Sequence, residues 1–234
     1  MRRPELSPRL RMVGDLVPAG ARLADVGTDH AYLPAALLLE GRIPWAVAAD
    51  LRRGPLDRAR ATVRSYGLTG RVEFRLCDGL TGVRPGEVDA VAIAGMGGET
   101  IAAILNAAPW TRERDVPLIL QPMTSMPDLR GWLQDNGFCI ETEQLAREGD
   151  ALYTALLVRA GEMGPLAPAE LWAGKNSKEA LRGAWLDQWL ARTGRALDGM
   201  AQARGEGVLA RRRALEEVRE GLAEMKKEWE QWQQ

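Results

Sequence analysis

The sequence predicts an α/β fold in which a Rossmann-like, mostly parallel sheet is followed by a helical coiled-coil hairpin. Between residue 22 and about residue 160, short apolar runs alternate with helical patterns, which is typical of a parallel sheet. Beyond residue 161, the apolar residues step by three and four, as on the buried face of a helix. The chain has 234 residues, 46% of them hydrophobic, which suffices for one large domain with an appendage. We therefore expect one domain over residues 1–160 and a second over residues 161–234.

Five short apolar runs are the candidate parallel strands, and each is followed by a glycine or proline that indicates a turn. These runs are Arg22–Val26, Trp45–Ala49, Val72–Cys77, Val88–Ala94 and Pro117–Gln121. Two extended segments, 138–148 and 151–159, come next and are joined by Glu148-Gly149-Asp150, which indicates a hairpin. The sheet is therefore predicted to end with an antiparallel strand. Five βα units closed by a hairpin are typical of class I methyltransferases that use S-adenosylmethionine (AdoMet), an analogy of architecture that does not settle the chemistry.

The first strand leads into the most informative loop, Asp25-Val26-Gly27-Thr28-Asp29-His30. A strand, a glycine turn and a helix, here residues 31–38, form the ligand-binding crevice of a doubly wound sheet. Dinucleotide-binding loops carry a second glycine two residues after the first, so that the backbone can approach the pyrophosphate. That position is Asp29 in this chain, and its negative charge would repel a diphosphate. AdoMet, which has no phosphate and carries sulfonium and ammonium groups, fits better.

Acidic residues end the first three candidate strands, at the edge of the sheet where a ligand lies. We expect Asp25 near the ammonium group of AdoMet, Asp50 on both ribose hydroxyls and Asp78 near the exocyclic amine of the adenine. Each residue could instead cap the following helix, but capping alone explains three such strands poorly. The residues beside them that we assign to the same cofactor site are Gly27, His30, Leu51 and Gly79.

The fourth strand is followed by Gly95-Met96-Gly97-Gly98, which predicts a tight turn with room for a close approach. A helix entry with positive φ would explain one of these glycines but not three. In AdoMet-dependent methyltransferases this loop lies under the reactive methyl group. We therefore assign Gly95 and Met96 to the cofactor and Gly97 to the acceptor. Gln121, at the end of the fifth strand, is also expected to contact the acceptor.

Two apolar stripes of helical spacing occupy the C-terminal part of the chain. One runs from Leu181 to Met200, and the other, a heptad seam, runs from Leu215 to Trp232. Gly205-Glu206-Gly207 lies between them and would break a helix. The simplest arrangement is two antiparallel helices packed as a coiled-coil hairpin. This hairpin is either purely structural or an arm that grips a substrate or a partner.

The composition excludes several classes of protein. Cys77, Cys139 and the single histidine, His30, are isolated, so they predict neither a metal site nor a disulfide framework. A lone histidine is also more readily a packed or capping residue than a catalytic base. The sequence suggests neither a signal peptide nor a membrane-spanning run, so we expect a cytoplasmic protein with no membrane partner. We also expect a monomer with no bound metal.

The net charge of −1 argues against a strong bulk attraction to nucleic acid, but charge is unevenly placed. Basic clusters occupy residues 1–11 and 52–75. The second cluster alone is more readily a solvated helix face, whereas two clusters beside one crevice raise the prospect of a phosphate-binding rim.

Three motifs are similar to those of the TrmK family, bacterial tRNA methyltransferases that modify N1 of adenine 22. They are ADVGTDHAYLP at residues 24–34, IAGMGG at residues 93–98 and LILQP at residues 118–122. The resemblance covers nearly the whole chain and implies AdoMet as cofactor and tRNA as substrate. It also supports Asp29 as the catalytic residue, a carboxylate that stabilises the positive charge developing on the base.

The chain departs from the family at two positions. Asp50 stands where members often carry glutamate, a chemically equivalent acceptor for ribose, and Met123 stands where they often carry asparagine. Two other functions stay open at this point. An AdoMet-dependent methyltransferase of this fold could modify another RNA position or a small molecule, and an RNA-binding scaffold could carry a vestigial pocket.

We expect Arg9 and Arg11, which precede the first strand, to contact tRNA phosphates. Alternatively, these arginines pack their stems against the domain and pair with Glu5 or Asp15. The arginines that would form a second rim are Arg52, Arg53 and Arg58.

Overall fold

The computed structural model describes residues 4–201 and 204–234. The chain divides into two compact units, Met1–Met163 and Gly164–Gln234. The first unit contains a seven-stranded sheet, and the second is helical. Among the described residues, no helix is both long and apolar enough to cross a membrane.

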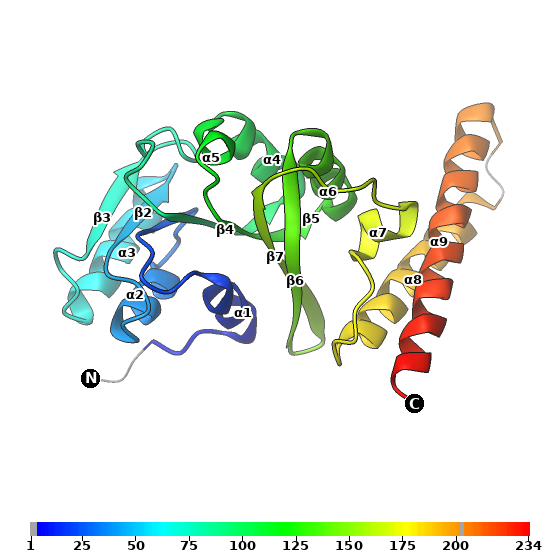
Figure 1. Ribbon diagram of the computed structural model, residues 1–234, viewed down its shortest axis with the longest axis horizontal. Coiled ribbons are helices and arrows are strands. Elements are labelled where there is room, and N and C mark those ends of the chain that lie inside the picture. Colours follow the sequence, from blue (N-terminus) through cyan, green and yellow to red (C-terminus); the bar gives the residue numbers. More distant parts are fainter. Residues whose placement is uncertain (1–3, 202–203) are drawn as a thin grey trace. The chain divides into compact units, whose positions relative to one another are not determined.

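The strands of the sheet follow the order β3-β2-β1-β4-β5-β7-β6 (Figure 1). They are β1 (Leu23–Val26), β2 (Ala46–Asp50), β3 (Val72–Leu76), β4 (Ala90–Gly97), β5 (Leu118–Thr124), β6 (Phe138–Glu148) and β7 (Ala151–Ala160). Strands β1 to β5 pair in parallel, and β7 pairs antiparallel with β5 and β6. The predicted fold class is therefore confirmed. Because the strand order reverses between β1 and β4, a ligand crevice is expected at the carboxyl ends of these strands.

Strands β4 and β5 run further than the sequence predicts. β4 continues to Gly97, so the glycine-rich motif is largely a strand end and not a free turn. Met96 pairs with Pro122, and the register shifts on both sides of Met96. Gly95, at a φ of +79°, and Pro122, which lacks an N–H, interrupt the regular ladder there. The predicted turn is therefore an irregular strand end whose position is set by sheet pairing.

Two groups of helices cover the two faces of this sheet (Figure 1). One face carries α1 (Pro8–Leu16), α2 (Tyr32–Leu39) and α3 (Arg53–Ser65), and the other carries α4 (Gly98–Asn106), α5 (Trp110–Glu113) and α6 (Met126–Asp135). Consecutive strand residues alternate between the two cores, as Leu23 and Ala24 do. Burial on both faces requires the continuous apolar runs that the sequence shows.

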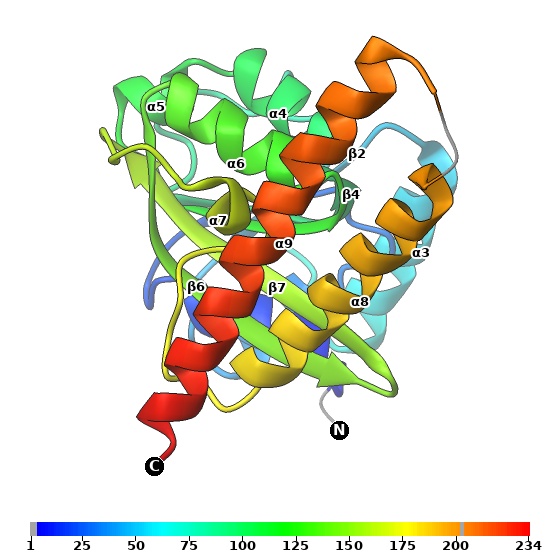
Figure 2. The same ribbon diagram turned by 90° about the vertical axis from the view of Figure 1, so that its right-hand side faces the viewer.

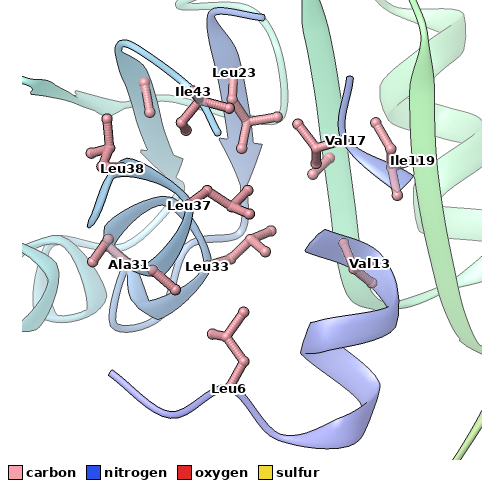
Figure 3. Close-up of a cluster of buried hydrophobic side chains, with 14 of the residues drawn as sticks. Leu6, Val13, Val17, Leu23, Ala31, Leu33, Leu37, Leu38, Ile43 and Ile119 are labelled. Carbon is pink, nitrogen blue, oxygen red and sulfur yellow. The ribbon is translucent and has the colours of Figure 1, made fainter. Parts of the chain in front are cut away.

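Helix α1 is an element that the apolar pattern did not predict. Ser7 caps its N-terminus, and Pro8 occupies its first turn, where a missing N–H costs nothing. Val13 of α1 lies in the same buried cluster as Leu33 of α2 (Figure 3). This packing fixes the helix that carries Arg9 against the sheet domain.

The second unit contains α7 (Pro168–Ala173), α8 (Arg182–Met200) and α9 (Glu206–Trp232). Helices α8 and α9 run side by side in opposite directions (Figure 2). The seam of α9 is buried at Leu215, Val218, Leu222 and Met225. Two details differ from the sequence reading: α7 was not predicted, and α9 begins at Glu206, so that Gly205 alone of the predicted break precedes it.

Candidate active site

The carboxyl ends of β1, β2, β3 and β4 surround a cavity of about 540 Å³, within the ~300–1,000 Å³ typical of small-molecule sites. Every residue predicted for the cofactor lines it, namely Asp25, Gly27, His30, Asp50, Leu51, Asp78, Gly79, Gly95 and Met96. Asp29 and Arg9 line it as well, whereas Arg11, Gly97 and Gln121 are not part of the lining. Segments far apart in the sequence thus converge on one cavity. The roles of the individual residues stay predictions.

Gly27 allows β1 to turn at this cavity. Its φ of +76° favours glycine, and its N–H donates to the carbonyl of Ala49 at 2.8 Å, which ties the turn to β2. A Cβ atom at this position would overlap the end of the Met96 side chain, which comes from β4. The ends of β1 and β4 therefore approach each other closely through this glycine.

Two carboxylates, Asp25 and Asp50, form what we call the floor of the cavity; they are only 7% and 8% exposed. Burial raises the pKa of Asp25 to about 6, an effect that Thr28 opposes and the charge of Asp50 reinforces. Asp50 Oδ1 accepts a hydrogen bond from the backbone N–H of Arg52 at 2.8 Å. An ionised carboxylate accepts several hydrogen bonds, so this one still leaves acceptor capacity for a ligand. A cationic ligand would compensate the buried charge of this floor.

Asp78 is exposed and lines the cavity just beyond β3. Gly79 follows it at a φ of +52°, and a Cβ atom there would lie 2.9 Å from side-chain carbons of Ile104. The turn after β3 therefore packs tightly against α4 while the neighbouring carboxylate remains accessible to a ligand.

Asp29 belongs to what we call the mouth of the cavity, formed with His30, Tyr32 and Arg58. Its side chain is 62% exposed, and it pairs with the Arg58 guanidinium. The Nε2 atom of His30 lies 3.5 Å from Asp29 Oδ2. The hydrogen bond from Arg58 holds the pKa of Asp29 below its ordinary value. Asp29 is therefore ionised at neutral pH, and the Arg58 guanidinium beside it partly compensates its negative charge.

Neither Tyr32 nor the contact between Asp29 and Arg58 is predicted from the sequence as part of the site. The rings of His30 and Tyr32 stack in parallel, with their centroids 5.1 Å apart and an angle of 4° between their planes. Tyr32 is 43% exposed and lines the cavity. The sequence signal for Tyr32 was an aromatic residue close to a ligand-binding loop. The Asp29–Arg58 pair joins residues 29 positions apart, which no local pattern reveals.

Arg9 and Gln121 form a hydrogen-bonded pair that corrects one prediction. Arg9 Nη1 donates to Gln121 Oε1 at 2.7 Å, and the backbone N–H of Gly95 donates to the same oxygen at 3.1 Å. Gln121 Nε2 donates to the carbonyl of Pro122 at 2.9 Å. Gln121 is 0% exposed, so it is out of reach of a substrate and does not make the predicted direct contact. It holds Arg9 and the end of β4 in place instead.

Arg11 and Gly97, two other residues predicted to contact the substrate, do not line the cavity. Arg11 lies outside the cavity and binds Glu40 through both terminal nitrogens, at 3.0 and 2.6 Å. Asp15 lies 3.8 Å from Arg11, which is one of the pairings considered as an alternative. Gly97 lies in β4, where a Cβ atom would approach Thr124 Oγ1 to 3.0 Å, and it does not line the cavity.

The basic clusters are only partly at the cavity. Arg52 lines it, and Arg58 is held by Asp29 at its mouth. Arg2 and Arg3 of the first cluster lie outside the described residues. In the part of the chain that the structure describes, no group of three or more His, Cys, Asp or Glu side chains could hold a metal ion.

Comparison with known proteins identifies the family. A family profile described as "Methyltransferase domain" matches residues 6–156. The chain belongs to this methyltransferase family. It is 37% identical over 158 residues to the tRNA (adenine(22)-N(1))-methyltransferase of Bacillus subtilis strain 168, an alignment that covers 68% of this chain and 66% of that protein, just under two thirds of its length.

Solved structures extend the likeness to nearly the full chain. The crystal structure of the B. subtilis m1A22 tRNA methyltransferase TrmK is 32% identical, with a TM-score of 0.85, and the match covers 95% of this chain and 99% of that one. Sp1610 from Streptococcus pneumoniae, described as a putative tRNA (m1A22) methyltransferase and solved with AdoMet, is 34% identical, with a TM-score of 0.80 and coverage of 92% and 100%. The resemblance to the TrmK family is therefore confirmed.

Proposed function

We propose that this protein transfers the methyl group of AdoMet to N1 of adenine 22 in tRNA. The observation that carries the proposal is the cavity at the switch in strand order, whose floor holds the buried carboxylates Asp25 and Asp50. The TrmK structures that this chain resembles over nearly its full length support the choice of substrate.

The carboxylates that line the cavity match the chemistry of AdoMet. Asp25 is a buried carboxylate with a raised pKa, and an ammonium group beside it would stabilise its ionised form. Asp50, held by the N–H of Arg52, is suited to accept from both ribose hydroxyls, and Asp78 from the adenine amine. AdoMet supplies the chemistry, an electrophilic methyl group on a sulfonium. Pyrophosphate-containing cofactors fit poorly, because these acidic groups would repel them.

The acceptor needs little more than positioning. Adenine N1 carries an available lone pair, so no proton has to be removed before attack, and the site requires no general base. N1 lies on the Watson–Crick edge, so the base must be unpaired to reach the cavity. Holding N1 in line with the reacting bond at about 3 Å can supply roughly 7–11 kcal/mol of the barrier. The product base is a cation, and Asp29, ionised and 62% exposed at the mouth, is placed to stabilise that charge.

All residues of this cavity come from the first unit of the chain. We assign AdoMet binding to the domain over residues 1–160, as the sequence predicts. Residues 161–234 are assigned to the second, helical domain, and none of those that the structure describes lines this cavity. Because one chain supplies every lining residue, we expect the enzyme to act as a monomer, which light scattering during chromatography would test.

A methylation assay tests the proposed function directly. The purified protein, AdoMet and an in vitro tRNA transcript should yield 1-methyladenosine on nucleoside mass spectrometry. A transcript with guanosine at position 22 is the matched control and should yield none. Methylation elsewhere in the tRNA, or only of a small-molecule extract, would contradict the proposal and favour the alternative acceptors. Absence of AdoMet binding by calorimetry would instead favour an RNA-binding scaffold.

A further inference from the structure

Two aromatic rings lie together at the mouth of the cavity, and the methyl-transfer chemistry derived above does not use them. The rings of His30 and Tyr32 are parallel within 4°, and their centroids are 5.1 Å apart. Both residues line the cavity. The His30 side chain is 35% exposed and Tyr32 is 43% exposed, so the pair offers uncovered ring surface. An additional flat ring can extend such a stack.

The backbone between the two rings is strained. Ala31 has φ 53° and ψ 28°, in the left-handed region that alanine rarely adopts. It is 2% exposed and packs in the core at the start of α2 (Figure 3). The left-handed residue delays the helix to Tyr32, one residue later than the sequence predicts. Strain of this kind persists where the surrounding structure imposes it, often beside a ligand site.

Charged groups lie beside His30 at the mouth of the cavity. His30 Nε2 lies 3.5 Å from Asp29 Oδ2, and Asp29 in turn pairs with Arg58. Arg52 also lines the cavity. A flat aromatic surface beside arginines has the chemistry that recognises an unpaired nucleobase, because the rings stack on the base while the cations attract its phosphates.

We propose that His30 and Tyr32 form a stacking platform for the target base of the RNA substrate. The inference rests on the proposed function and deepens it by naming the residues that hold the acceptor. The adenine of the cofactor is expected elsewhere, because the roles assigned to Asp50 and Asp78 put it over the ends of β2 and β3, whereas the platform follows β1. His30, which the sequence assigned to the cofactor, is given to the acceptor here. A base stacked on the platform has Asp29 beside it. Methylation makes that base a cation, which an aromatic face stabilises.

Replacing the tyrosine ring tests the platform. Tyr32→Leu keeps an apolar side chain but removes the ring, and Tyr32→Phe keeps the ring and removes the hydroxyl. We expect Tyr32→Leu to lower kcat/KM for tRNA by about 10- to 100-fold, the range of one base–aromatic stack. Tyr32→Phe should restore most of this loss. AdoMet affinity by calorimetry and the melting temperature should be the same in all three proteins, because Tyr32 is partly exposed and carries no assigned cofactor contact.

A second readout reports stacking itself. A tRNA transcript with the fluorescent adenine analogue 2-aminopurine at position 22 is bound to each protein in the presence of S-adenosylhomocysteine. Stacking on the platform quenches the analogue, so its emission should rise several-fold with Tyr32→Leu and stay low with Tyr32→Phe. Wild-type kinetics and emission in Tyr32→Leu, or losses in Tyr32→Phe as large as those in Tyr32→Leu, would overturn the platform alone. A wild-type enzyme that does not methylate tRNA would overturn the proposed function and the platform with it.

Discussion

The floor and the mouth of the cavity both carry carboxylates, but in opposite environments. Asp25 at the floor is 7% exposed, and burial raises its pKa to about 6. Asp29 at the mouth has a side chain that is 62% exposed, and the guanidinium of Arg58 lowers its pKa. The two residues are only four positions apart, Asp25 in β1 and Asp29 in the turn that follows it.

This difference separates two tasks. A buried carboxylate without a cation is unfavourable, and a cationic ligand removes that penalty, so the floor favours a positively charged cofactor. An exposed and paired carboxylate contributes little to stability and can exchange partners when a substrate arrives. We therefore expect changes at the floor to alter AdoMet affinity and changes at the mouth to alter turnover on tRNA.

The largest effect is expected at Asp50. Asp50→Ala removes the acceptor for both ribose hydroxyls, and hydrogen bonds to a charged group contribute roughly 1.5–3 kcal/mol each, so AdoMet affinity should fall about 100-fold or more. Asp50→Glu is the matched control and should retain most of the affinity, because it keeps the carboxylate. Isothermal titration calorimetry measures both. A loss of less than about threefold in Asp50→Ala would contradict the ribose assignment.

Asp25 should make AdoMet binding depend on pH. The free protein holds Asp25 with a pKa of about 6, whereas the ammonium-bound form needs the ionised carboxylate. Affinity should therefore fall as the pH drops below 6, by up to about tenfold per pH unit. Asp25→Asn should bind AdoMet more weakly at neutral pH and show a flatter profile between pH 5 and about 7. An unchanged profile in this variant would show that another group titrates.

The same residue should lower the stability of the free protein at neutral pH. The pKa of Asp25 rises from 3.8 to about 6 on folding. The contribution of Asp25 to the free energy of unfolding is therefore fully present below pH ~4, and it is lost as the pH rises through ~6. The upper limit of this loss is about 3 kcal/mol. Without AdoMet, Asp25→Asn should therefore unfold at a higher temperature than the wild type at pH 7.5 and lose that advantage at about pH 4, as calorimetry would measure. A lower melting temperature at pH 7.5 would contradict it.

At the mouth, Asp29→Asn should reduce turnover on tRNA while AdoMet affinity stays unchanged. Loss of a charge that stabilises the transition state is expected to lower kcat by roughly 10- to 100-fold. Arg58→Ala should have a smaller effect, since it removes the partner but leaves the carboxylate. Asp29→Asn with full turnover and unchanged AdoMet affinity would exclude the proposed role.

The order of the elements and the membership of the cavity could be predicted because both follow from local signals. The carboxyl ends of parallel strands share one edge of a sheet, so identifying the strands and their turns was enough to bring Asp25, Asp50 and Asp78 together. The prediction of a positively charged cofactor followed from the negative charge of these residues at the strand ends.

The side-chain partners could not be predicted, because they depend on tertiary packing. Arg9 and Gln121 are 112 positions apart, and nothing in either segment indicates that they form a hydrogen bond. Helix α1, which brings Arg9 to the cavity, was itself missed, although Ser7-Pro8 carries a helix-start signal. The extension of β4 depends on its pairing with β5, which a single strand does not reveal.

The smallest effects should separate Arg9 from Arg11, which the sequence treats alike. Arg9 lines the cavity and is held by Gln121, whereas Arg11 lies outside it on Glu40. Arg9→Ala should therefore weaken tRNA binding and reduce the slope of log affinity against log salt by about 0.9, the value for one lost phosphate contact. Arg11→Ala should leave that slope unchanged and lower the free energy of unfolding by less than about 1 kcal/mol, as expected for an exposed ion pair. AdoMet affinity should be equal in both variants. If Arg9→Ala weakened AdoMet binding and left the salt slope intact, the anion that Arg9 binds would be the cofactor's carboxylate and not a tRNA phosphate.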